Sequence, residues 1–178
     1  MRSNRGHAPA RRFAALCCLC ALIAAGALAQ PVPEQDLKAA FIFNFAVFTE
    51  WPQEALAGGA PITVCAGPTT SMFGALSQLN DKQVNGHRIA VRSAAVLRGC
   101  HVLVLDRSDR ERWVQIRREL AGAPVLTVSD DPGLSDGGAV ITLTVEDKRI
   151  GFHVDLAAAR SARLSLSSKL LRLARNVQ

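Results

Sequence analysis

Several features that mark common classes of protein are missing from this sequence. Beyond the first thirty residues there is no apolar stretch of the roughly twenty residues that a membrane-spanning helix needs. No glycine-rich phosphate loop follows any predicted strand, and there is neither an internal repeat nor a low-complexity segment. Only Cys65 and Cys100 lie beyond residue 30, so the rest of the chain can form one intramolecular disulfide at most.

The first thirty residues have the pattern of a secretory signal peptide. A basic start is followed by the almost unbroken apolar run 13–28, and Ala27-Leu28-Ala29 has the small-x-small pattern of a cleavage site. The basic residues of this start are Arg2, Arg5, Arg11 and Arg12. We therefore predict a signal peptide over residues 1–29 and a mature domain over 30–178. An uncleaved anchor is the alternative, but the apolar run is shorter than a spanning helix.

The net charge changes once this segment is set aside. The full sequence has 21 Lys and Arg and 15 Asp and Glu, a net charge of +6. Removing the four arginines leaves 21 − 4 = 17 basic residues and a net charge of 17 − 15 = +2. The basic balance thus belongs mainly to the targeting segment, so we expect no nucleic-acid partner. The expected location of the mature protein is the bacterial periplasm.

Predicted strands alternate with predicted helices along the remaining chain. Apolar runs and turn residues predict strands at 61–67, 87–94, 100–106 and 125–130, helices at 35–50, 71–79 and 108–120, and a β-hairpin at 139–156. A helix follows from Leu156, broken near Leu164-Ser165, and Ser167 is predicted to cap a last helix at 168–176. This order predicts a single-domain α/β sandwich, with a mainly parallel sheet flanked by helices and an antiparallel edge hairpin.

The aromatic residues are concentrated in one helix. Residues 41–52 contain Trp51 and four of the six phenylalanines that follow the N-terminal segment. Helical spacing predicts one core face, made of Leu37, Phe41, Phe45 and Phe48. Phe43 falls on the opposite side, with Ile42 and Ala46 also off the core face. Either the core covers this helix on all sides, or a second chain covers the side around Phe43.

No group of residues has the spacing of a catalytic or metal site. The histidines His87, His101 and His153 are each isolated on a strand, so structural roles are expected for them. Asp106 is expected to cap the turn after its strand, and the aspartates Asp130, Asp131 and Asp136 fit turn chemistry better than a calcium loop. Ser167-Ser168-Lys169 matches a Ser–Lys pair, but no oxyanion loop accompanies it. We expect no enzyme activity, no metal and no cofactor.

Cys65 and Cys100 each lie at a predicted strand. If the two strands are neighbours, an oxidising compartment would favour a disulfide between them. Closing a loop of about 35 residues would stabilise the fold by roughly 3–4 kcal/mol. Two buried thiols that never pair are the alternative.

The C-terminal segment 156–178 is basic. It has five basic residues and no acidic one. They are Arg160, Arg163, Lys169, Arg172 and Arg175. The segment is either a helix with a solvated basic face or a docking surface for an acidic partner or anionic lipid headgroups. The predicted partner-binding residues of the whole chain are Phe43, Trp51, Arg163, Lys169, Arg172 and Arg175.

Several segments together resemble the YfiR family of periplasmic regulators (YfiR/HmsC-like). They include "LKAAFIFNFAVFTEWP", "ITVCAG", "VNGHRIAVR", "GCHVLVLDRS", "APVLTVSD", "GGAVITLTVEDKRIGFHVDLAAA" and the closing "LSSKLLRLA". The resemblance extends from about Asp36 to Ala174. It implies a dimeric α/β regulator that holds an inner-membrane diguanylate cyclase of the GGDEF type inactive from the periplasmic side, lowering cyclic-di-GMP and biofilm output.

The resemblance also implies partners and a bond. An outer-membrane OmpA-like lipoprotein would relieve the repression. Cys65 and Cys100 fall where the family has a cysteine pair thought to form a disulfide, whereas the second pair of the name-giving member is missing from residues 140–154.

Two other functions are kept as alternatives. A periplasmic small-molecule-binding sensor would have its pocket in the loops after Cys65 and Asp106, and its melting temperature would rise with ligand. An uncharacterised hydrolase would lose activity when Ser167 or Ser168 is replaced by alanine.

Overall fold

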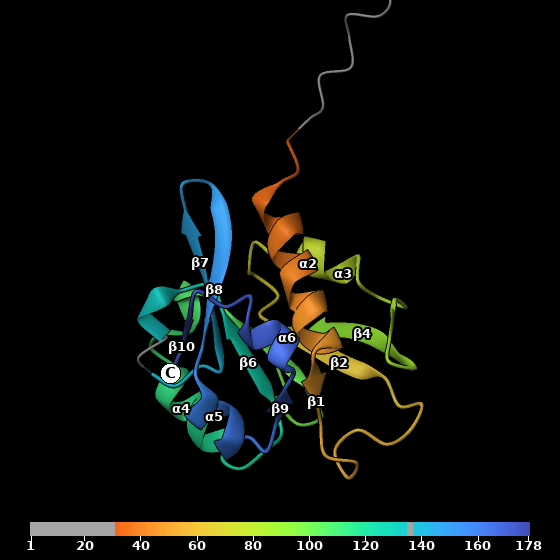
Figure 1. The fold of residues 1–178 in the computed structure, drawn as a ribbon. Coiled ribbons are helices and arrows are strands. Elements are labelled where there is room, and N and C mark those ends of the chain that lie inside the picture. The colour runs from red at the N-terminus through yellow and green to blue at the C-terminus, as the bar shows by residue number, and fades with distance from the viewer. Residues whose placement is uncertain (1–30, 135–136) are drawn as a thin grey trace, which may run out of the picture. The chain divides into compact units, whose positions relative to one another are not determined.

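The computed structural model describes residues 31–134 and 137–178. The predicted signal peptide, residues 1–29, and Asp136 lie outside the described residues. Pro33–Gln178 form one compact unit (Figure 1). Among the residues that the structure describes, none belongs to a helix that is both long and apolar enough to cross a membrane.

An eight-stranded sheet forms the centre of this unit, in the order β10-β8-β7-β6-β5-β2-β4-β3. Five of its seven neighbouring pairs are parallel, and only β7/β8 and β3/β4 are antiparallel. The predicted α/β class and mainly parallel sheet are therefore confirmed. The strands are β2 (Ile62–Ala66), β3 (Gln83–Val84), β4 (His87–Ser93), β5 (Val102–Leu105), β6 (Leu126–Ser129), β7 (Ile141–Glu146), β8 (Arg149–Val154) and β10 (Asn176–Val177).

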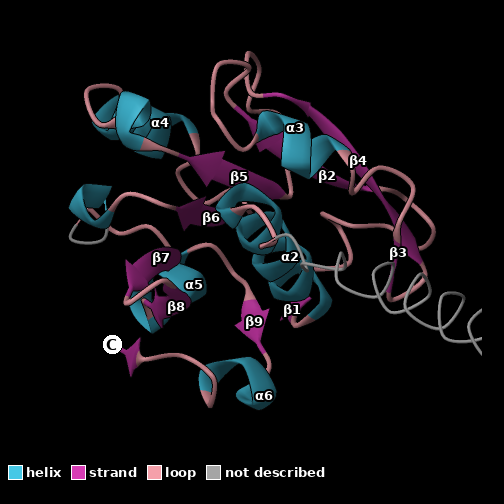
Figure 2. Ribbon diagram, turned by 90° about the horizontal axis from the view of Figure 1, so that it is seen from above, coloured by secondary structure: helices cyan, strands magenta, loops and turns pink. Residues whose placement is uncertain are grey.

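Helices cover both faces of the sheet because its central strands are apolar on both sides. Val64, Val102 and Val104 belong to a large core that includes side chains of α2 (Glu34–Val47) and α3 (Phe73–Ser77). Leu103 and Leu105 point the other way, into a smaller core with α4 (Trp113–Glu119). Figure 2 shows α2 and α4 on opposite sides of β5 and β6.

The buried face of α2 differs from the predicted one. Ile42, Phe45 and Ala46 are the residues of this helix that the core covers almost completely, together with Ala39 and Lys38. Leu37, predicted in the core, is 40% exposed, and Phe41 and Phe48 are only partly buried at one flank. The predicted face is turned about the helix axis relative to the buried face. The helix is apolar nearly all round, so periodicity alone favoured the row of phenylalanines over the smaller residues that pack against the sheet.

The C-terminal region returns to the start of the fold. The predicted hairpin is present as β7 and β8, with Asp147 and Lys148 in left-handed conformations at its turn. After α5 (Leu156–Ser161), β9 (Ser165–Leu166) pairs antiparallel with β1 (Thr49–Glu50) in a separate two-stranded sheet.

Two predicted helices are shorter than expected. The last one, α6, covers only Ser168–Leu171, and the unpredicted β10 follows it and pairs with β8 at the sheet edge. Ser167 caps α6 as predicted, because its hydroxyl accepts the Lys169 N–H at 3.2 Å. The helix predicted over 108–120 is divided into a 3-10 turn, η1 (Arg107–Asp109), and α4.

Candidate functional site

A disulfide joins Cys65 to Cys100, as predicted for this pair. Cys65 lies in β2, and Cys100 ends the turn that leads into β5, the parallel neighbour of β2. Their Cα atoms are 5.8 Å apart, and both side chains are buried in the smaller core beside α4. The bond therefore ties two central strands together beneath one helix layer.

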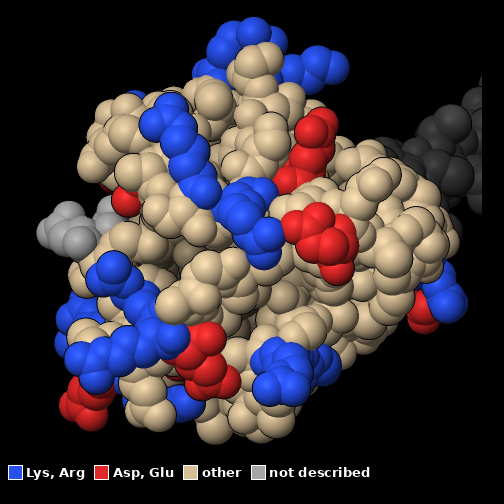
Figure 3. All heavy atoms as spheres, turned by 90° about the horizontal axis from the view of Figure 1, so that it is seen from below, with Lys and Arg blue, Asp and Glu red and all other residues tan. Residues whose placement is uncertain are grey.

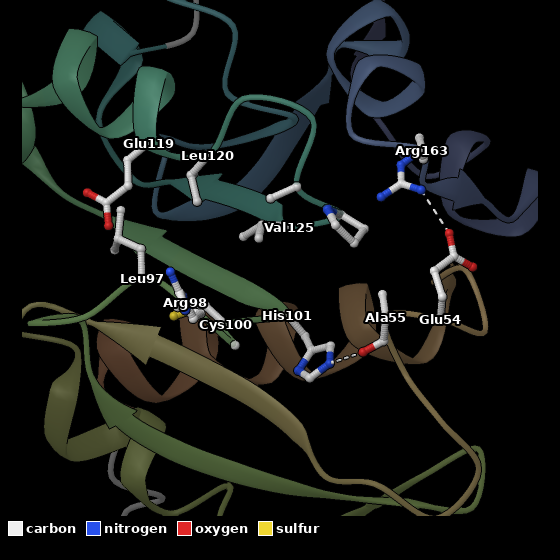
Figure 4. A pocket seen from close by; sticks show the side chains of 13 residues that line it. Glu54, Ala55, Leu97, Arg98, Cys100, His101, Glu119, Leu120, Val125 and Arg163 are labelled. Carbon is white, nitrogen blue, oxygen red and sulfur yellow. Dashed lines mark hydrogen bonds and ion pairs between the residues drawn. The ribbon is translucent and has the colours of Figure 1, made fainter.

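A cavity of about 410 Å³ lies beside this disulfide (Figure 4). Its lining comes from the turn before β5, the end of α4 with the segment between α4 and β6, and three outlying residues, Glu54, Ala55 and Arg163. The apolar part of its wall includes Leu97, Leu120 and Val125. Most of the lining residues come directly before β5 or β6 in the chain. The cavity therefore lies at the amino ends of these parallel strands.

Charged groups surround the cavity. Arg163 Nη1 is 2.8 Å from Glu54 Oε1, an ion pair that links the C-terminal region to the segment after Trp51. Arg98 and Glu119 also line the cavity and have no ion pair among the described residues. Seen from below, this side of the molecule has basic and acidic side chains next to one another (Figure 3). It therefore has no continuous patch of one sign.

His101 forms part of the cavity wall and has partners at both ring nitrogens. The Thr63 N–H donates to Nδ1 at 3.0 Å, and Nε2 is 3.0 Å from the carbonyl oxygen of Ala55. Burial lowers the pKa of His101, with smaller contributions from the positive charge of Arg92 and from His87, against the Ala55 carbonyl, which raises it.

Two consecutive carboxylates follow β6 and hold the helix layers on either side of the sheet. Asp130 lies 3.2 Å from Nζ of the buried Lys38, which also pairs with Glu34 at 2.7 Å. Burial alone would lower the pKa of Lys38, but these two carboxylates together raise it. Asp131 contacts the Arg110 guanidinium through both oxygens. It also accepts the Gly133 N–H at 3.1 Å, the turn bond expected of it.

The carboxyl edge of the sheet offers less space than the sensor alternative expects. The loops after β2 and β5 do enclose a cavity there, but its volume is only about 120 Å³, well below the roughly 300–1,000 Å³ of typical ligand sites. Asp106 caps η1 as predicted, since its carboxylate accepts the Ser108 N–H at 2.8 Å. Among the residues described, no cluster of three or more His, Cys, Asp or Glu side chains is arranged to hold a metal ion.

A family model described as YfiR/HmsC-like matches residues 35–175. The chain belongs to the YfiR/HmsC-like family. This is a regulatory family, and its known members regulate diguanylate cyclase activity. The match covers nearly all of the described fold, including both cysteines of the disulfide.

A solved structure has a similar fold. It is a conserved domain protein from Vibrio cholerae O1 biovar eltor, with a TM-score of 0.51 and 11% sequence identity over 84% of this chain. The likeness covers 62% of that protein's length. At this identity it supports the fold alone.

The predicted partner-binding residues of this YfiR/HmsC-like protein do not form one patch. Phe43 lines a shallow groove of about 150 Å³ between α2 and α3, with Lys82 Nζ 5.9 Å from its ring centroid. Trp51 is turned inward, and its Nε1 donates to the carbonyl oxygen of His101 at 3.2 Å. Arg163 is paired with Glu54, as described above. These residues stay predicted contacts, but two of the three already have internal partners.

The other three lie on and after α6. Lys169 and Arg172 are exposed and have no ion pair among the described residues. The Arg175 side chain instead lies against Gly151 and pairs with Glu146. Because Arg175 directly precedes β10, these contacts connect β10 to the hairpin. A side chain at position 151 would occupy the space of this guanidinium, so the Arg175 side chain would have to move to make room for it.

An exposed apolar surface on the α2 side of the hairpin was not predicted. Phe41 contacts Phe152 of β8, with ring centroids 6.2 Å apart, and Leu37 lies one turn before Phe41 on the same helix flank. Val145 pairs with Ile150 across the hairpin. We call this surface the α2–hairpin face: Leu37, Phe41, Val145, Ile150, Leu171 and Leu173. Leu173 is 67% exposed, the highest value among the large apolar side chains described.

Proposed function

We propose that this protein is a periplasmic negative regulator that binds and represses an inner-membrane diguanylate cyclase of the GGDEF type. Its effect would be lower cyclic-di-GMP, and with it less biofilm and exopolysaccharide. The observation that carries the proposal is the family match, which spans residues 35–175. A repressor of this kind requires a stable scaffold and a binding surface, and it requires no catalytic group.

The disulfide supports the periplasmic part of the proposal. Structural disulfides persist in oxidising compartments such as the periplasm and are rare in the cytosol. Cys65 and Cys100 are both buried, and the bond between them spans 35 residues. The predicted signal peptide over residues 1–29 would deliver the chain to that compartment.

The cyclase would bind at the α2–hairpin face and the basic residues beside it. Lys169 and Arg172 lie in α6 or at its end, close in sequence to the exposed Leu173. Apolar side chains bordered by unpaired cations are the composition expected of an interface with an acidic, partly apolar partner. A homodimer and an OmpA-like outer-membrane lipoprotein that relieves repression are part of the same proposal, drawn from the family.

The test is cellular cyclic-di-GMP in a deletion strain that receives the gene back in different forms. Deletion should raise cyclic-di-GMP, and the wild-type gene should restore the low level. Arg172→Glu should fail to restore it, because it reverses a charge beside the α2–hairpin face. Phe43→Ser should also fail, because it changes the second predicted partner contact, in the groove between α2 and α3. Arg118→Glu is the matched control, since this exposed arginine is on α4 across the sheet and should restore repression fully.

Three results would count against the proposal. An unchanged cyclic-di-GMP level in the deletion strain would remove the repressor function under the conditions tested. Full restoration by both Arg172→Glu and Phe43→Ser would keep the function and reject these contacts. Failure of Arg118→Glu would show that the loss of repression does not depend on the predicted surface.

Binding of a small molecule is a second candidate function, and the cavity of about 410 Å³ beside the disulfide favours it. Its size falls within the range of ligand sites, and it lies at the amino rather than the carboxyl edge of the sheet. A rise in melting temperature with ligand, lost on filling the cavity with Ala123→Leu, would support this function. The two functions are compatible, because a repressor can also be a sensor.

A further inference from the structure

The hydrogen bonds of His101 fix its protonation state. A backbone N–H can only donate, so the Thr63 N–H requires an unprotonated Nδ1. A carbonyl oxygen can only accept, so the Ala55 oxygen requires a proton on Nε2. The ring is therefore neutral, with its single proton on Nε2, and a second proton at Nδ1 would face the Thr63 N–H.

His101 holds the segment 51–60, which joins β1 to β2. The ring binds the Ala55 carbonyl, the His101 carbonyl accepts the Trp51 indole N–H at 3.2 Å, and the two rings meet edge to face with centroids 6.3 Å apart. Among the described residues, the remaining polar attachments are the exposed pair between Glu54 and Arg163 and a bond between His87 and the Ala60 carbonyl. Trp51 and Leu56 also pack against the larger core. Exposed ion pairs contribute little, so His101 provides the main hydrogen bond to the middle of this segment.

The charged groups around the ring oppose a second proton. Arg92 and His87, both on β4, disfavour a charge at His101. Arg98, on the turn before β5, lines the same cavity. Glu54, Arg163 and Glu119 complete the charged lining, and the first two neutralise each other. Glu119 is the one unpaired carboxylate among the described lining residues, set against the two arginines at positions 92 and 98.

His87 is an internal comparison, because among the described residues its ring is bound at one nitrogen only. Its Nδ1 lies 2.7 Å from the Ala60 carbonyl and must donate to it. Among the described residues, its Nε2 has no hydrogen-bond partner. Both histidines hold the same segment, but only His101 has a second ring nitrogen that accepts a backbone N–H and must stay unprotonated to keep that bond.

We propose that His101 is a pH-sensitive latch. Acidification protonates Nδ1 and breaks the bond to Thr63, because two N–H groups would then face each other. The ring moves away from the Thr63 N–H, the bond from Nε2 to the Ala55 carbonyl is lost with that movement, and the middle of the segment 51–60 is released from the sheet. The release moves Trp51, Glu54 and Ala55, and two of these three residues line the cavity beside the disulfide. The structural part of this inference stands on the geometry alone. Its regulatory part, that acid alters partner binding near Trp51, rests on the proposed function.

The test is nuclear magnetic resonance of the isotopically labelled protein between pH 7.5 and pH 5. The His101 ring nitrogens should show the Nε2–H form at pH 7.5 and should titrate below the ordinary histidine value of about 6.5. The Thr63 amide and the Trp51 indole N–H should shift with the same midpoint. A Trp113→Phe variant identifies the Trp51 signal, since the sequence has only two tryptophans.

Two variants make the result specific. His87→Gln should retain the transition at Thr63 and Trp51, whereas His101→Gln should lose it. Signals of Thr63 and Trp51 that do not change over this range, or a transition that persists in His101→Gln, would overturn the proposal. If His101→Gln does not fold, the wild-type titration decides alone, through the coincidence or separation of the three midpoints. None of these measurements involves a cyclase, so failure of the latch is distinguishable from failure of the proposed function.

Discussion

Replacing both disulfide cysteines by alanine should remove a large part of the stability of this domain. The bond closes a segment of 35 residues, for which the chain-entropy relation gives about 13 cal/mol/K, or about 4 kcal/mol at 25 °C. Both side chains are buried, at 0% and 5% exposure, so the lost sulfur contacts add to this cost. Single domains have about 5–15 kcal/mol in total, so the Cys65→Ala/Cys100→Ala variant should lose between about a quarter and about four-fifths of the free energy of unfolding.

Urea unfolding followed by circular dichroism measures this loss. With a slope of about 2 kcal/mol/M, a loss of about 4 kcal/mol lowers the unfolding midpoint by about 2 M. A reductant should lower the midpoint of the wild type by a similar amount and leave the double variant unchanged, which is the control. A loss of less than about 1 kcal/mol in the double variant would refute the predicted contribution of the disulfide. So would a reductant that still shifts the midpoint of the double variant.

Two further predictions concern the charged contacts that hold the sheet edges. Asp131→Asn should destabilise the protein by roughly 1–3 kcal/mol at pH 7 in the same urea assay. The hydrogen bonds from Arg110 lower the pKa of Asp131, so the wild-type advantage is complete above the unfolded value of about 3.9 and should shrink as the pH falls below it; an unchanged difference at pH 3 would contradict this. Gly151→Val should displace the Arg175 guanidinium and speed hydrogen exchange in β10, as judged by mass spectrometry. In an Arg175→Ala background the same substitution should have no further effect on exchange, and an effect of equal size there would exclude the displacement.

Patterns with a strong local signal predicted most of the sheet. The continuous apolar run before Asp106 predicted the fully buried β5, and the Asp147-Lys148 turn predicted the hairpin, because each depends on residues close in sequence. The two-residue strands β1, β9 and β10 could not be predicted, since their pairing partners lie far away along the chain. In α2, the burial of Lys38 depends on Asp130, 92 residues later, and helical periodicity contains no information about such a partner.

The candidate site was harder to predict than the fold. The cysteine pair could be anticipated from an even count in an exported chain, because the oxidising compartment favours the bond. His101 was set aside as a structural histidine, and its role depends on Ala55 and Thr63, two backbone groups that carry no signature of their own. The α2–hairpin face was not predicted for the same reason. Whether Leu173 and Val145 are exposed depends on how the hairpin and α6 pack in the folded domain, and the residues next to them in the sequence do not indicate it.

The pairing of β1 with β9 has a consequence for the order of folding. Thr49 is joined to Leu166, and Leu170 of α6 belongs to the core that covers α2. The first helix of the domain therefore cannot complete its core until the last fifteen or so residues have been synthesised. Contacts that span nearly the whole chain make folding slow compared with local structure formation. During synthesis, α2 would thus stay without its full cover until residue 170 has left the ribosome.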